Sequence, residues 1–195
     1  MVLTASSKLK YVYSGAPIRN ASRVRNPNTP QISAKIMILG AVGVGKSSLI
    51  KRFVRDSFDS EYKTTIGVDI QTCDVALEDE TVRLMLWDTD GDFGQRIFDT
   101  AYIKGASGAI MIADASRPAT IDKLQGLLAA FDSNYPGRPL RAVINKSDLV
   151  DVSSLDLKAS GLHVSEALFT SAKTGEGVRE LFVSLAADVA RRRPA

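Results

Sequence analysis

A glycine-rich loop between an apolar strand and an amphipathic helix constrains the fold of this 195-residue chain more than any other feature. Residues 35–39 form an apolar run of strand length, which ends at Gly40. The sequence GAVGVGKS follows at residues 40–47 and matches the pattern G-x-x-x-x-G-K-[ST] in full. Residues 47–54 then carry apolar side chains at helical spacing. A strand that passes through glycines directly into a helix is typical of α/β proteins that bind phosphate with backbone N–H groups.

The remainder of the chain alternates predicted strands with predicted helices. Further strands are predicted at residues 68–77, 81–87, 108–113, 140–144 and 166–170, and further helices at 119–131 and 177–191. The first two of these strands form a hairpin through residues 78–80. This order predicts an α/β fold with a mostly parallel six-stranded sheet, one antiparallel edge strand and helices on both faces. Ligands bind such sheets at the carboxyl ends of strands, so we expect chemistry after Leu39, Trp87, Ile144 and Thr170.

The composition excludes several classes of protein. One cysteine allows neither an internal disulfide framework nor a cysteine-based zinc site, and one histidine excludes a histidine-rich metal centre. No apolar stretch approaches the roughly 18 residues that a membrane-spanning helix needs.

Positive charge is concentrated before the predicted domain. Residues 1–33 contain five Lys and Arg and no Asp or Glu, so the net charge of +3 leaves −2 for the remaining residues. We therefore expect a disordered basic extension over 1–33 and a folded domain over 34–193. Aromatic residues hardly interrupt the positive charges of the extension, which argues against nucleic-acid binding. Its composition also resembles an organelle transit peptide, but the amphipathic period of such peptides is weak, so import is the weaker alternative.

The residue types of the loop suit a triphosphate. Glycines allow backbone N–H groups to surround phosphate oxygens, and the following helix presents its positive end. Lys46 is expected to reach the β- and γ-phosphates, and the Ser47 hydroxyl to ligate Mg²⁺. The nucleotide-binding residues predicted in this segment are Gly40, Ala41, Val42, Gly43, Val44, Gly45, Lys46, Ser47 and Ser48.

The sequence NKSD at residues 145–148, directly after a predicted strand, addresses the base. The Asp148 carboxylate would accept hydrogen bonds from the N1–H and the amino group of guanine, a donor pair that adenine lacks. Asn145 is expected to tie this loop to the phosphate loop, and the stem of Lys146 to cover the base. The segment after the last strand completes the pocket with Ser171, Ala172 and Lys173.

Five segments in this order resemble the Ras superfamily of small GTPases, and Rab proteins in particular. They are GAVGVGKS, TIGVD at 65–69, WDTDG at 87–91, NKSD, and TSAK at 170–173. The resemblance covers residues 34–193 and implies a Ras-like P-loop GTPase fold. It also implies a monomeric GTP/GDP switch with Mg²⁺, whose partners are effectors, exchange factors and GTPase-activating proteins.

The resemblance implies roles for matching residues. Thr65 would bind Mg²⁺ and the γ-phosphate, Asp88 would hold Mg²⁺ through water, and the Gly91 N–H would sense the γ-phosphate. Phe58 would pack against the guanine nucleoside, or alternatively anchor a surface loop, and Tyr62 would cover the phosphates. The residues that match the effector-binding positions of Rab proteins are Ile70, Trp87 and Tyr102, for which ordinary half-buried packing is the alternative.

One segment departs from the family pattern. Where the family reads WDTAGQE, this chain reads WDTDGDF, so Asp92 replaces the glutamine that orients the attacking water. Asp90 adds a second carboxylate beside the phosphates, and two like charges 4 Å apart cost about 4 kcal/mol at an effective dielectric constant near 20. We expect slow GTP hydrolysis, with the catalytic positions Asp92, Lys46, Thr65 and Gly91. The alternative is a hydrolysis-deficient interaction module that binds nucleotide.

The residues that carry lipid in Rab proteins have no counterpart here. Residues 191–195 contain no cysteine, Cys73 lies in a predicted strand, and Val2 excludes N-myristoylation. We expect a cytoplasmic protein that lacks a stable membrane anchor and associates with membranes transiently at most.

Overall fold

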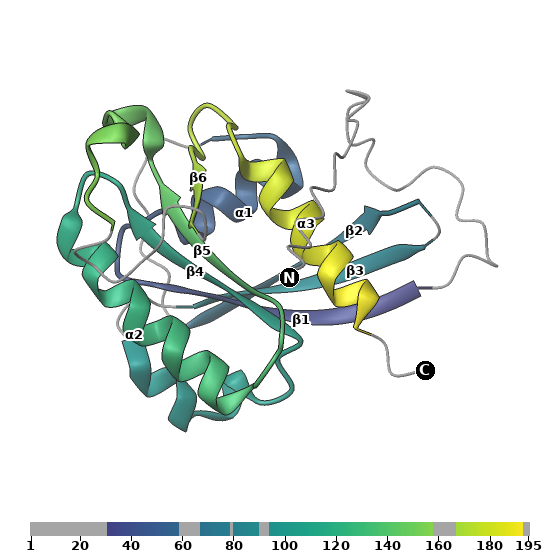
Figure 1. The fold of residues 1–195 in the computed structure, drawn as a ribbon. Coiled ribbons are helices and arrows are strands. Elements are labelled where there is room, and N and C mark those ends of the chain that lie inside the picture. Colours follow the sequence, from purple (N-terminus) through teal and green to yellow (C-terminus); the bar gives the residue numbers. More distant parts are fainter. Residues whose placement is uncertain (1–30, 59–66, 79, 90–93, 158–166, 193–195) are drawn as a thin grey trace, which may run out of the picture.

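The computed structural model describes residues 31–58, 67–78, 80–89, 94–157 and 167–192. Six strands and three α-helices make up the described fold (Figure 1). The strands are β1 (Gln31–Gly40), β2 (Val68–Ala76), β3 (Thr81–Thr89), β4 (Gly108–Asp114), β5 (Leu140–Asn145) and β6 (Ala167–Thr170). The helices are α1 (Lys46–Arg55), α2 (Pro118–Asn134) and α3 (Val178–Arg191).

The strands form one sheet in the order β2-β3-β1-β4-β5-β6. Strand β2 pairs antiparallel with β3 at one edge, and every other neighbouring pair is parallel. The predicted fold class, with a single antiparallel edge strand, is therefore confirmed. Because β3, β1, β4, β5 and β6 run parallel, their carboxyl ends lie at the same edge of the sheet.

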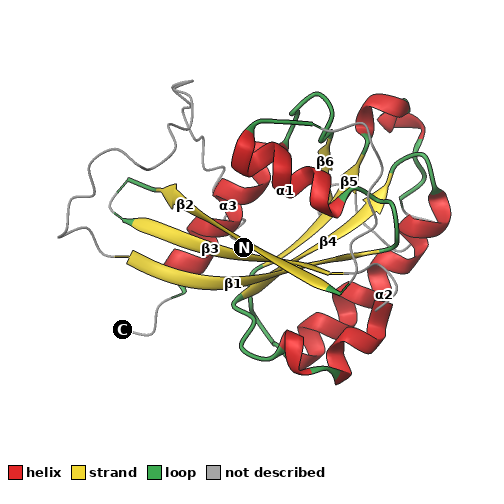
Figure 2. Cartoon of the chain, turned by 180° about the vertical axis from the view of Figure 1, so that it is seen from behind, coloured by secondary structure: helices red, strands yellow, loops and turns green. Residues whose placement is uncertain are grey.

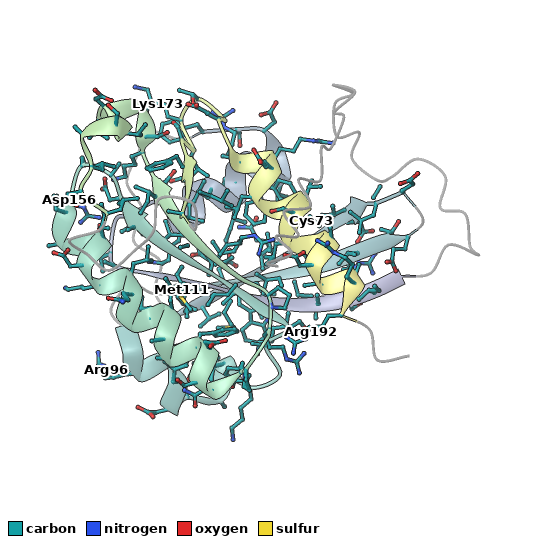
Figure 3. All side chains as sticks on the ribbon, viewed as in Figure 1. Cys73, Arg96, Met111, Asp156, Lys173 and Arg192 are labelled. Carbon is teal, nitrogen blue, oxygen red and sulfur yellow. The ribbon has the colours of Figure 1, made fainter. Side chains whose placement is uncertain are left out.

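Helices cover both faces of the sheet, with α1 and α3 on one face and α2 on the other (Figures 1 and 2). On the first face, the rings of Phe53 from α1 and Phe182 from α3 stack with centroids 4.2 Å apart. On the second face, Met111 of β4 packs in the same apolar cluster as Phe131 of α2 (Figure 3). Strand β4 is buried along its whole length, as expected for a central strand covered on both sides.

The largest differences from the sequence prediction are at the start of β1 and between β3 and β4. Strand β1 begins at Gln31, so residues 31–33, expected in the extension, belong to the sheet and pair with β3 from Thr81 onward. Short 3-10 helices at Gly94–Asp99 and Ala101–Ile103, which the sequence does not predict, join β3 to β4. Among the described residues, no helix has the length and apolar character needed to cross a membrane. The expected disorder of residues 1–30 lies outside the described residues.

Candidate functional site

The carboxyl ends of four parallel strands bring polar residues together at one edge of the sheet. Asp114 at the end of β4 pairs with Asn145 at the end of β5, and Asn145 pairs with Thr170 at the end of β6. Strand β1 ends next to them at Gly40, which is the register partner of Ile112. This edge includes the loops that the sequence singles out.

The glycine loop after β1 needs glycine at its two ends. Gly40 has a φ of +148°, and a Cβ atom there would lie 2.2 Å from the carbonyl oxygen of Ile112. Gly45 has a φ of +98°, and its Cβ would lie 2.3 Å from Nδ2 of Asn145. A side chain at either position would have to displace backbone or a buried amide. The loop is thus held between β4 and the segment after β5.

Lys46 places a buried ammonium group at the start of α1. The residue is 7% exposed, and its Nζ atom donates hydrogen bonds to the carbonyl oxygens of Gly40 and Ala41, each at 3.0 Å. The first turn of α1 holds no acidic residue to compensate the positive end of the helix. Positive charge and backbone N–H groups converge here, which is the arrangement that binds phosphate.

A hydroxyl and a carboxylate meet beside this helix start. The Ser47 Oγ atom donates a hydrogen bond to Oδ2 of Asp88, and Asp88 is 1% exposed. Both groups offer the oxygen ligands that Mg²⁺ prefers in proteins, and both lie next to a phosphate-binding loop. The donor set therefore fits a magnesium ion that is shared with bound phosphates.

The buried side chain of Asn145 connects three segments of the site. Its Nδ2 atom donates to the carbonyl oxygen of Val44 at 2.9 Å. Its Oδ1 atom accepts hydrogen bonds from the Thr170 hydroxyl at 3.1 Å and from the Ala172 N–H at 3.2 Å. The expected tie between the base loop and the phosphate loop is thus present, and it extends to the loop after β6.

The predicted base-binding residues lie close together. The Ser171 hydroxyl donates to Oδ1 of Asp148 at 2.6 Å, and Nζ of Lys173 lies 4.0 Å from Oδ2 of the same carboxylate. Figure 3 shows Lys173 in the loop that follows β6. Lys146 has a left-handed backbone with a φ of +65°, and its ammonium group donates to Asp114 at 2.7 Å. The orientation of Asp148 is therefore fixed by the loop after β6.

Three residues contribute to the site that sequence reasoning did not identify. Asp114 ends the apolar strand β4, and a lone carboxylate at a strand end was the signal available for it. Arg117 donates to Asp114 at 2.9 Å and to the carbonyl oxygen of Val42 at 2.9 Å. Arg52 on α1 donates to the carbonyl oxygens of Ala172 and Lys173 at 2.8 and 2.6 Å. The contacts of Arg117 with Val42 and of Arg52 with the loop after β6 are long-range, and such contacts leave no local pattern in the sequence.

The three apolar residues matched to effector positions are neighbours in the structure. Ile70 on β2 is the cross-strand partner of Trp87 on β3, and the rings of Trp87 and Tyr102 have centroids 6.5 Å apart. Ile70 and Tyr102 are 48% and 44% exposed. The ammonium group of Lys35 lies 3.6 Å from the centroid of the Trp87 ring, a cation–π contact. These residues form a continuous, partly exposed apolar surface.

Some predicted site residues cannot be placed. Tyr62, Thr65, Gly91 and Asp92 lie outside the described residues, as does Asp90. Among the remaining predicted residues, Phe58 is 41% exposed after α1, and Val42 of the glycine loop is 37% exposed. Their predicted contacts with nucleotide stay predictions.

The described fold, with a glycine loop that leads into α1 and the predicted base-binding segments after β5 and β6, defines a P-loop nucleotide-binding protein. The Ras family matches residues 35–191. The chain is 36% identical to Ras-related protein Rab-18 of Caenorhabditis elegans, over 81% of this chain and 80% of that protein. It is 34% identical to Ras-related protein Rab-22A of Canis lupus familiaris, over 82% and 83% of the two chains.

A plant relative gives a similar result: Ras-related protein RABF2a of Arabidopsis thaliana is 32% identical over 84% of each chain. The chain therefore belongs to the Ras family, and it is a Rab-like small GTPase. The resemblance drawn from the motifs is confirmed. As a member of this family, it is a small GTP-binding switch protein.

Proposed function

We propose that this protein is a guanine-nucleotide switch that binds GTP or GDP with Mg²⁺ and hydrolyses GTP slowly without a partner. The observation that carries the proposal is the position of Asn145, which joins the phosphate loop to both base-binding segments by three hydrogen bonds. A single ligand with phosphates at one end and guanine at the other spans these segments. Titration with GTP, GDP and ATP tests this. Competition by ATP on equal terms with GTP, or unchanged selectivity in Asp148→Ala, would contradict it.

Magnesium would be held by Ser47, by Thr65 and, through water, by Asp88. A magnesium ion bound there would supply positive charge to the phosphates. The contact between Ser47 and Asp88 supports this assignment, because it brings two oxygen ligands together at the start of α1, beside the glycine loop. Lys46 adds the charge of its ammonium group on the same loop. When GTP is bound, Thr65 and Gly91 would contact the γ-phosphate, and its loss would release both segments.

Slow hydrolysis is proposed from the residues at positions 90 and 92. The carboxylate of Asp92 would not replace the amide of glutamine in orienting water, and Asp90 would add negative charge if it lies beside the phosphates as its place in the family motif implies. Phosphate release measured in a single turnover is expected to be no faster than about 4 × 10⁻⁴ s⁻¹, the order found for Ras without its activating protein. The double variant Asp90→Ala with Asp92→Gln is expected to be at least about tenfold faster, a change of 1.4 kcal/mol in the barrier.

A hydrolysis-deficient interaction module is the second candidate function, and the same two carboxylates favour it. Such a protein would keep GTP or GDP as a structural ligand. A double variant that remains as slow as the natural chain, together with tight GTP binding, would support this candidate and contradict the switch. Addition of a GTPase-activating protein of the Rab type provides a second comparison, since an activating protein can contribute catalytic groups to the site.

Effectors would contact the apolar surface formed by Ile70, Trp87 and Tyr102 in the GTP-bound form. Large, partly exposed aromatic residues are typical anchors of protein interfaces. Exchange factors and GTPase-activating proteins would act on the segments near the γ-phosphate.

We further propose a monomeric, cytoplasmic protein that associates with membranes transiently. Retention on vesicles at high salt in a flotation experiment would contradict the last point.

A further inference from the structure

A buried carboxylate lies between the two nucleotide-binding loops, in a position that the family motifs leave unassigned. Asp114 is 1% exposed at the end of β4, next to the N-terminus of α2. Burying an ionised carboxylate without partners costs several kcal/mol, so such a group persists only when its oxygens are satisfied. The contacts of Asp114 therefore indicate what it holds in place.

Both oxygens of Asp114 are satisfied, and two of the donors are cations. Oδ2 accepts hydrogen bonds from Nζ of Lys146 at 2.7 Å and from Nε of Arg117 at 2.9 Å. Oδ1 accepts from the N–H and the hydroxyl of Ser116 at 3.0 and 2.7 Å. Burial opposes ionisation, but the bonds from Lys146 and Ser116 outweigh it and keep the pKa of Asp114 below its ordinary value of 3.8. The group is ionised at neutral pH.

The second cation continues to the phosphate loop. Nη2 of Arg117 donates to the carbonyl oxygen of Val42 at 2.9 Å, across 75 positions of sequence. Lys146 belongs to the base loop. One carboxylate thus connects the loop that binds phosphate, through Arg117, to the loop that binds the base, through Lys146. This connection differs from the one that Asn145 makes, because it passes through the side chains of Asp114 and Arg117, between β4 and α2, and not through the side chain of Asn145.

Hydrogen bonds and a proline hold the backbone around Arg117, independently of the contacts that its side chain makes. The Arg117 N–H donates to the carbonyl oxygen of Asp114 at 2.9 Å, and the Thr120 hydroxyl donates to the Arg117 carbonyl oxygen at 2.7 Å. Pro118 begins α2 directly after it and restricts the backbone further. Because its backbone is already held, Arg117 loses less conformational freedom when its side chain forms hydrogen bonds. The planar guanidinium group can donate to Asp114 and to the Val42 carbonyl oxygen at once.

We infer that Asp114 and Arg117 are positioning residues that fix the distance between the phosphate loop and the base loop, and thereby slow the release of guanine nucleotide. The inference rests on the proposed nucleotide site but adds a function for two residues that contact neither phosphate nor base in that proposal. Without this connection, the hydrogen bond from Asn145 to Val44 is left to hold the phosphate loop to the base loop. The two loops then separate more often, and the nucleotide is released faster.

The experiment measures the release of fluorescent GDP from the full chain after addition of excess unlabelled GDP. Arg117→Ala is expected to speed release about fivefold to tenfold. Arg117→Lys keeps the charge but cannot bond both acceptors. Its release rate is expected to lie between those of the natural chain and Arg117→Ala. Asp114→Asn is expected to act more strongly, and adding Arg117→Met to Asp114→Asn should change the rate little further, because both changes break the same connection.

Arg138→Ala is the matched control, since it removes an exposed arginine from the loop that follows the other end of α2. Its release rate should equal that of the natural chain. A rate for Arg117→Ala within twofold of the natural chain would overturn the inference, even if the variant melts at a lower temperature. That result separates a merely structural role from the one inferred.

A second readout compares GDP with inosine diphosphate, which lacks the amino group of guanine. If Arg117 fixes the distance between the loops, its loss should speed the release of both nucleotides by the same factor. A change in the ratio of the two rates would overturn the inference, because it would place Arg117 in base recognition. Failure of the natural chain to bind GDP at all would contradict the proposed function and not this inference alone.

Discussion

The amide nitrogen of Asn145 lies where a side chain on Gly45 would have to be. The nitrogen donates to the carbonyl oxygen of Val44 at 2.9 Å, and a Cβ atom on Gly45 would lie 2.3 Å from it. The last residue of the glycine loop and the first residue of the base loop are thus in direct contact. A side chain at position 45, just before α1, and the hydrogen bond from Asn145 to Val44 therefore exclude each other.

Gly45→Ala is expected to abolish tight nucleotide binding. The added methyl group would push Asn145 out of its hydrogen bonds, and alanine would also be strained at a φ of +98°. Gly105→Ala is a matched control, since Gly105 shares a positive φ of +75° but has open space around the position of its Cβ. The control should lower the free energy of unfolding by about 1–2 kcal/mol and leave binding intact. Equal loss of binding in both variants would show that backbone strain, and not the contact with Asn145, is responsible.

Asn145→Ala should speed GDP release about 30-fold, which corresponds to about 2 kcal/mol. The substitution leaves three buried groups without their partner, namely the Val44 carbonyl, the Thr170 hydroxyl and the Ala172 N–H. Asn134→Ala on α2 serves as the control, because its side chain bonds only within its own helix to the carbonyl oxygen of Ala130. Fluorescence of bound nucleotide measures both rates. Release at the natural rate in Asn145→Ala would contradict the structural argument.

Arg52→Ala is expected to loosen the loop after β6. The Arg52 guanidinium binds the carbonyl oxygens of Ala172 and Lys173, and it is mostly buried, so its removal should lower the free energy of unfolding by about 2 kcal/mol and speed GDP release about tenfold. Arg55→Ala removes an exposed arginine from the same last turn of α1 and provides the comparison. Chemical denaturation and nucleotide release together test the prediction. An Arg52→Ala protein that behaves like Arg55→Ala would refute it.

The sequence predicts most of the fold because its signals are local. Apolar runs mark β1, β4 and β5, and the glycines that end β1 mark the phosphate loop before any tertiary contact is known. The start of β1 was placed too late because Gln31 and Ser33 are polar. They join the sheet only because β3 lies beside them, a tertiary contact that overrides local preference.

The residues of the site also divide into those that a local motif predicts and those that only tertiary contacts bring into place. Asn145 and Asp148 are found from a motif, and the structure brings them beside Val44 and Ser171 as the strand order requires. Arg117 is different, because its contact with Val42 depends on how the chain turns between β4 and α2 and on one side-chain rotamer. Nothing in the sequence around Arg117 encodes that rotamer. Asp114 could have been predicted from its position at the carboxyl end of β4, but its partners could not.

Cys73 is expected to react slowly with iodoacetamide at pH 8. Burial, followed by the negative charge of Asp74, raises the pKa of the thiol to about 12 from its ordinary value of 9.0. At pH 8 only about one thiol in 10⁴ would be ionised, against roughly one in ten for an unperturbed thiol, and the thiolate is the reactive form. Mass spectrometry of the single cysteine gives the rate directly. Full modification of the folded protein within minutes, as fast as in the unfolded protein, would contradict the prediction.

The stability that Asp114 contributes should be lost only in acid. Since the pKa of Asp114 lies below 3.8 in the folded protein, its ionised form is favoured by folding, so the contribution is present above that pH and declines as pH falls through the folded pKa. The free energy of unfolding of the natural chain should exceed that of Asp114→Asn by about 2 kcal/mol, unchanged from pH 8 to pH 5. The difference should shrink below about pH 4. Asp132→Asn, which changes an exposed carboxylate on α2, should match the natural chain across the same range. A difference that already shrinks between pH 7 and pH 5 would mean that Asp114 is protonated in the folded protein, and that the cations Lys146 and Arg117 do not hold it ionised.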